Sequence, residues 1–256
     1  MPASFLSLPA ELRNEIYMYL LVRSEPIDPW NGGHELVPNL LSTNTKILHE
    51  ARSLLYGDNC FDLSRWESEI IAQFLDTIGF INASYLQCIR IDFPTLRELE
   101  YKVNLEVDSL RILEKIQCHC INLEKVITTS KSTTAMENQL DSFDSPKICE
   151  KALALVDARF REISSLQEIV IEVYEEGPSL DLRRKMRSRG WILNVVEEPV
   201  EEVKWNFHTS WDGLEDDEYV CDDDYNDYFD VDDYNDDYDD DYDIDNDSDF
   251  WRRAAD

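Results

Sequence analysis

The sequence predicts an α/β fold, with an α+β arrangement as the alternative. Three observations support this class. Amphipathic segments with helical spacing fill much of the first eighty residues, three short β-branched segments that share one spacing alternate with helical segments after them, and the chain ends in a stretch made largely of Asp and Tyr. We therefore expect a helical region over residues 1–64, an α/β repeat-like region over 65–205 and a disordered acidic tail over 212–256.

The first helix is expected between residues 9 and 22. Pro9 stands where a first helical residue belongs, because proline has a fixed φ and lacks an N–H that would go unpaired there. Leu12, Ile16 and Leu20 recur every four residues and form one apolar stripe, and Arg13 faces away from it. Such a stripe packs either into the protein's own core or into the groove of a partner.

The rest of the helical region continues this pattern. Two prolines and two glycines predict a loop over residues 24–33, and an apolar face predicts a second helix over 37–56 that Gly57 would cap. A short strand over 60–63 and a third helix over 66–79, ending at a glycine, complete the series.

The following segments alternate between strand and helix. Three strands are expected at "LQCIRI" (86–91), "LEKVIT" (123–128) and "LQEIVI" (166–171), and their starts are 37 and then 43 residues apart. Helices are expected between them at 107–120 and 146–163, and a fourth helix–strand pair at 180–191 and 192–197. Repeated units of this kind predict a parallel sheet lined by helices, as in leucine-rich repeats, with irregular unit lengths. A plain α/β sandwich of three or four strands is the alternative.

The net charge of the chain limits the classes of partner that we expect it to bind. The net charge is −31, and residues 212–249 hold 21 acidic side chains with no Lys or Arg. Nucleic acids and anionic membranes attract basic surfaces, so we expect neither as a partner. No apolar run is long enough to cross a bilayer and no secretory signal is evident, so a cytoplasmic or nuclear location is expected.

The sequence lacks the common motifs of catalytic and phosphate-binding sites. The chain has neither a glycine-rich phosphate loop nor a G-x-S-x-G nucleophile turn, and it is therefore not expected to be an enzyme or to hold a cofactor. The pattern "CHC" (118–120) lacks the second ligand pair that a structural zinc site needs, so no metal is expected. The cysteines are interpreted as small buried apolar residues of a reducing compartment.

The acidic tail has two interpretations. Asp-rich segments with regularly placed Tyr, in which "DDYND" occurs twice, resemble disordered segments that fold onto basic partners such as histones. The other interpretation is a self-repelling appendage that keeps the protein soluble.

Three segments resemble motifs of a known family. The opening "LPAELRNEIYMYLL" is similar to the start of an F-box, a short helical module that opens with L-P-x-E and spaced aliphatic residues. A second motif, at 40–63, is similar to a run found in F-box-like proteins of filamentous fungi, and so is the segment 74–93. The matching residues of the second motif are Asn44, Ile47, Glu50, Ala51, Tyr56, Gly57, Asn59 and Phe61.

The resemblance implies a non-enzymatic adaptor. F-box proteins bind the Skp-type adaptor of a cullin–RING (SCF-type) ubiquitin ligase through their N-terminal helices and recruit a protein substrate through their C-terminal repeats. Helix-in-groove recognition would supply the contact. Mapped onto this chain, the residues that would contact the adaptor are Leu8, Pro9, Leu12, Ile16, Leu20 and Leu21. The alternative is an interaction protein, independent of ubiquitin, whose acidic tail binds basic partners.

Overall fold

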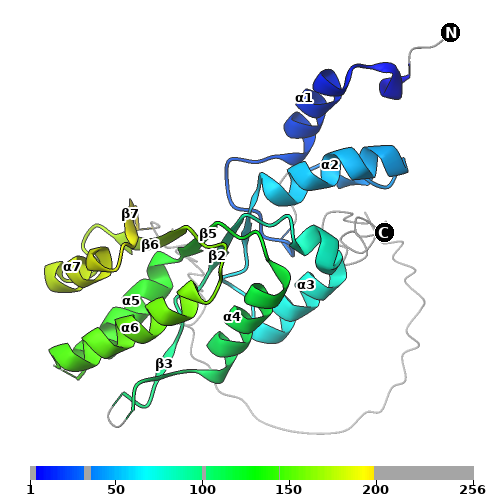
Figure 1. The fold of residues 1–256 in the computed structure, drawn as a ribbon. Coiled ribbons are helices and arrows are strands. Elements are labelled where there is room, and N and C mark those ends of the chain that lie inside the picture. Colours follow the sequence, from blue (N-terminus) through cyan, green and yellow to red (C-terminus); the bar gives the residue numbers. More distant parts are fainter. Residues whose placement is uncertain (1–3, 32–35, 100–101, 144, 199–256) are drawn as a thin grey trace, which may run out of the picture. The chain divides into compact units, whose positions relative to one another are not determined.

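The structure is a computed structural model that describes residues 4–31, 36–99, 102–143 and 145–198 (Figure 1). The predicted acidic tail, residues 212–256, lies outside the described residues, as does the end of the predicted repeat-like region.

A five-stranded parallel sheet organises the fold and confirms the predicted α/β class (Figure 1). Neighbouring strands follow one another in chain order, an arrangement that the repeat interpretation requires. The strands are β1 (Cys60–Asp62), β2 (Cys88–Ile91), β5 (Lys125–Thr128), β6 (Glu168–Tyr174) and β7 (Ile192–Val196). All five were predicted from the sequence. The predicted boundary at residue 64 falls just after β1, so the sheet takes its first strand from the N-terminal region.

Strands β2, β5 and β6 are each entered through the same turn. In each turn a leucine N–H donates to the carbonyl oxygen three residues earlier, at 3.2, 3.1 and 3.0 Å. The three donor–acceptor pairs are Leu86–Ala83, Leu123–Cys120 and Leu166–Ile163. The side chains of Leu86 and Leu123 are fully buried and that of Leu166 is half-buried. The first leucine of the repeated spacing therefore closes the turn with its backbone N–H and packs its side chain toward the core.

Most helices lie where they were predicted (Figure 1). Their bounds are α1 (Ala10–Leu21), α2 (Thr45–Gly57), α3 (Ser68–Ala83), α4 (Val107–His119), α6 (Pro146–Arg161) and α7 (Leu180–Ser188), with 3₁₀ turns η1 (Phe5–Ser7) and η2 (Pro38–Leu40). The predicted continuous helix over 37–56 is wrong: it divides into η2 and α2, because the Asn44 side chain accepts a hydrogen bond from the Lys46 N–H and starts α2 anew. Helix α3 also passes its predicted end, with a kink at Gly79 (φ 75°, ψ 163°).

Besides the turn η1, sequence reasoning missed one helix and a pair of short strands. Helix α5 (Ser130–Asp141) is rich in Ser and Thr, which favour caps over helix interiors, and Thr129 caps it by accepting from the Ser132 N–H. Its buried apolar residues, Met136 and Leu140, are too few to give a strong helical pattern. The other missed element is a two-stranded antiparallel ladder, β3 (Leu96–Arg97) with β4 (Asn104–Leu105).

Alternation along the strands gives the sheet two different faces. One face is mainly apolar, and its central residues Phe61, Ile89, Val126 and Ile171 are fully buried. The other, called here the polar sheet face, includes the apolar Ile127 and Val170 but carries many polar or sulfur-bearing side chains. Among them are Cys60, Asp62, Cys88, Arg90, Lys125, Glu168, Glu172 and Asn194.

Candidate functional site

An ion pair and several hydrogen bonds hold helix α1 against α2. The Nε and Nη2 atoms of Arg13 donate to the two carboxylate oxygens of Glu50 at 2.8 and 2.6 Å, and Nη1 donates to the carbonyl oxygen of Leu8 at 2.5 Å. The Tyr17 hydroxyl donates to the same carboxylate at 3.1 Å. Arg13, Tyr17 and Leu21 therefore form the buried face of α1.

Electrostatics favours the charged forms of this pair. Hydrogen bonds from the Arg13 guanidinium hold the pKa of the Glu50 carboxyl below its usual value. Glu50 in turn raises the pKa of Arg13 by accepting those bonds. The geometry is the bidentate one that arginine makes with a carboxylate, which fixes orientation as well as distance.

The opposite face of α1 is apolar and exposed. Leu12 is 46% exposed, Ile16 36% and Tyr19 82%. The three residues occupy positions i, i+4 and i+7, so they form one continuous line along the helix, called here the α1 stripe. The described residues after position 64 do not bury it, which answers the question that the sequence left open for Leu12 and Ile16.

The remaining predicted contact residues differ in their exposure to solvent. Pro9 is exposed and Leu8 is half-buried at the entry to α1. Leu20 is half-buried and packs against the core. Leu21 is fully buried, which corrects its assignment as a contact residue, because it lies on the Arg13 side of the helix. The predicted stripe, with one residue in every four, did not include Tyr19. Tyr19 occupies position i+7 from Leu12, which lies on the same face of a helix.

The second motif of the resemblance has structural roles. Ile47, Ala51, Tyr56 and Phe61 lie in the core, and Asn44 caps α2. Asn59 is 1% exposed: its Nδ2 donates to the carbonyl oxygens of Leu21 and Leu55, both at 2.7 Å, and its Oδ1 accepts from the Arg23 N–H at 2.7 Å. These residues join the end of α1, the end of α2 and the start of β1.

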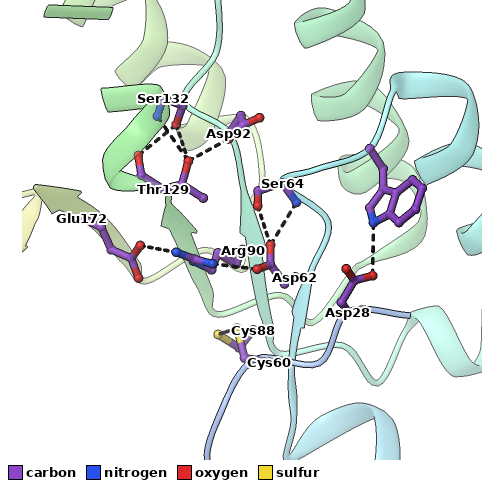
Figure 2. A network of polar contacts seen from close by, with 11 residues as sticks. Asp28, Cys60, Asp62, Ser64, Cys88, Arg90, Asp92, Thr129, Ser132 and Glu172 are labelled. Atoms are coloured by element: carbon purple, nitrogen blue, oxygen red, sulfur yellow. Dashed lines mark hydrogen bonds and ion pairs between the residues drawn. The ribbon is translucent and has the colours of Figure 1, made fainter. Parts of the chain in front are cut away.

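An ion-pair network crosses the polar sheet face (Figure 2). Arg90 on β2 donates to Asp62 on β1 at 2.7 Å and to Glu172 on β6 at 2.6 Å. Ser64 donates to Asp62 at 2.6 Å, and near the carboxyl end of β2 the Thr129 hydroxyl donates to Asp92 at 2.7 Å. The network presents fixed charges and hydroxyl groups beside one another.

Two hollows border the sheet. A groove of about 510 Å³ follows the amino ends of β1, β2, β5 and β6, and its lining includes Cys60, Cys88, Lys125 and Glu168. A smaller pocket of about 160 Å³ lies near the carboxyl ends of β1 and β2 and is lined partly by α3 and α4.

The "CHC" segment does not form a cluster of ligands. Cys118 is exposed, whereas Cys120 is buried, and burial raises the pKa of the Cys120 thiol to about 12. The His119 ring lies 2.9 Å from the Lys115 carbonyl oxygen and 3.4 Å from Asp76. Within the described ranges, no group of three or more His, Cys, Asp or Glu side chains could hold a metal ion, and no helix is long and apolar enough to span a membrane.

Comparison of the chain with protein-family models, curated proteins and solved structures gives no significant match. The candidate site is therefore defined by its own geometry: the exposed α1 stripe, held by the Arg13–Glu50 pair, and the polar sheet face.

Proposed function

We propose that this protein is a non-enzymatic adaptor of the cytoplasm or nucleus, the substrate-recognition subunit of a cullin–RING ubiquitin ligase. The observation that carries the proposal is the exposure of Leu12 and Ile16 on a helix whose other face is fastened to the body of the protein. The L-P-x-E opening, with Leu8 and Pro9 just before α1, supplies the family resemblance.

A fixed helix with an exposed apolar stripe suits helix-in-groove binding. Leu12, Ile16 and Tyr19 would enter the groove of a Skp-type adaptor as apolar anchors. Because Arg13 and Glu50 already hold α1 in place, little conformational entropy is lost on docking, and less binding energy is spent on ordering.

The polar sheet face is proposed as the substrate-binding side. Arg90 and Lys125 alternate there with Asp62, Glu168 and Glu172, so the face carries both signs of charge at fixed positions. Asp62, Arg90 and Glu172 are mostly buried and paired with one another, so the exposed Lys125–Glu168 pair is the part of this face that we expect to contact a partner of complementary charge.

Co-expression with a Skp-type adaptor tests the docking step. The wild-type protein is expected to co-purify with the adaptor, and the double variant Leu12→Asp, Ile16→Asp is expected to lose it while its circular dichroism is unchanged, because both side chains are exposed. The matched control is Phe80→Asp, Ile81→Asp, which places the same charges at two exposed apolar residues of α3 and should leave binding intact. Retention of the adaptor by the α1 variant, or failure of the wild type to bind any such adaptor, would refute the proposal.

The acidic tail lies outside the described residues, and its binding to basic proteins such as histones stays a sequence prediction.

A further inference from the structure

Cys60 and Cys88 face each other across two neighbouring parallel strands. They are directly paired in the register of β1 and β2, and their Sγ atoms are 2.7 Å apart (Figure 2). Neighbouring strands lie about 4.8 Å apart, within the Cα separation of roughly 4.4–6.8 Å that a disulfide spans. The backbone therefore already holds the two residues at a separation that suits a bond between their sulfur atoms.

Small reagents can reach the pair. Both cysteines are half-buried, and both line the groove of about 510 Å³ at the amino ends of the strands. Gln87, Lys125 and Glu168 line the same groove, so it is polar and accessible to water and small polar oxidants. Cys120, by contrast, is buried in the core.

The surroundings shift the pKa values of the two thiols in opposite directions. The hydrogen bond between them, together with the nearby Lys125 ammonium, lowers the pKa of Cys88. The same hydrogen bond and burial raise the pKa of Cys60. Cys88 is therefore the residue that more readily becomes a thiolate, the form of cysteine that reacts with oxidants.

We propose that Cys60 and Cys88 form a redox modification site, which hydrogen peroxide converts into a disulfide between β1 and β2. The Cys88 thiolate attacks one peroxide oxygen, the O–O bond breaks, and the leaving hydroxide takes a proton to become water. The Cys60 sulfur then attacks the resulting sulfenic sulfur, the S–O bond breaks, and the second oxygen leaves as water with the Cys60 proton. Two thiols and one peroxide thus give one disulfide and two waters. A dithiol reductant reverses the change by thiol–disulfide exchange.

The bond would join two parts of the fold. Cys60 directly follows Asn59, which fastens α1 and α2, whereas Cys88 lies in the second strand of the sheet. A disulfide closes the loop over residues 60–88, which contains α3, and restricts the unfolded chain. Oxidation is therefore expected to raise the midpoint temperature of unfolding by several degrees.

Peptide mapping of the full-length protein tests the site. Trypsin separates the pair into peptides 53–65 and 66–90, each with one cysteine, because cleavage sites follow Arg52, Arg65 and Arg90. After graded peroxide treatment and alkylation, mass spectrometry should find these two peptides joined, at lower peroxide than oxidises Cys118 or Cys149, and separate again after dithiothreitol. Alkylated Cys60 and Cys88 at peroxide levels that oxidise Cys118, or bonds from either residue to another cysteine, would overturn the proposal.

Two variants complete the test. Cys60→Ser should leave a sulfenic acid on Cys88 that dimedone traps, and should abolish the difference in unfolding temperature between oxidised and reduced protein. Cys118→Ser, at an exposed cysteine of α4, should behave like the wild type. A thermal difference that persists in a folded Cys60→Ser protein would contradict the site, and if this variant does not fold, the peptide map of the wild type decides alone.

Discussion

Arg13 of α1 and Glu50 of α2 form a two-point ion pair, with donor–acceptor distances of 2.8 and 2.6 Å, on the face of α1 that sequence periodicity assigns to the outside. The charged side chain of Arg13 is buried because Glu50, its partner, lies on that side of α1. Leu12 and Ile16, on the opposite side of the helix, are therefore exposed. The position of the α1 stripe thus depends on a contact between residues 37 positions apart.

Removing one partner of this pair should loosen α1. Glu50→Gln keeps the shape but leaves the Arg13 guanidinium, which is 5% exposed, without its counter-charge. The midpoint of thermal unfolding should fall by several degrees, and limited proteolysis should cleave within α1 sooner. Lys46→Ala is the control, since Lys46 is exposed and lies 3.9 Å from the same carboxylate. Equal effects of the two substitutions would show that the Arg13 pair has no special role.

The same pair predicts a dependence on pH. The pKa of Glu50 is lower in the folded protein than the ordinary value of 4.5, so its contribution to stability is complete above that value and is lost as pH falls through the folded pKa. The difference in unfolding temperature between wild type and Glu50→Gln should therefore be constant near neutrality and shrink below pH 4.5. A difference that stays constant down to complete acid unfolding would contradict this assignment.

Asn59 should be among the most sensitive positions. Asn59→Ala removes the buried amide that donates to the carbonyl oxygens of Leu21 and Leu55, and it also removes the side-chain oxygen that accepts from the part-buried Arg23 N–H. The free energy of unfolding should fall by about 3 kcal/mol, measured by urea denaturation. Asn14→Ala, at an exposed residue of α1, should change it by less than about 0.5 kcal/mol.

Gly79 tests the kink of α3. Its φ of 75° and ψ of 163° lie in a region that side chains disfavour, although no atom lies within 4 Å of where a Cβ would stand. Gly79→Ala should therefore cost about 1–3 kcal/mol through the backbone alone. Gly57→Ala is the matched control: Gly57 ends α2 without a positive φ, and its added Cβ would meet the Tyr85 carbonyl oxygen at an ordinary 3.4 Å. A smaller loss at Gly79 than at Gly57 would contradict the backbone explanation.

The sequence by itself determined the alternation of strands and helices. The repeated leucine spacing placed β2, β5 and β6, because an apolar strand followed by a helix needs no distant partner to be recognised. It did not reveal α5, whose Ser- and Thr-rich sequence has weak helical preference and whose helix is supported by the Thr129 cap and the burial of Met136 and Leu140.

Only the tertiary structure decided how these elements are used. Arg13 is inside because Glu50 meets it, Leu21 is inside because it shares that face, and Leu12 and Ile16 are therefore exposed. Cys60 and Cys88 form a pair because parallel pairing sets them in the same register. Periodicity along one segment gives the faces of a helix or a strand, but which face is buried depends on contacts between segments distant in the sequence.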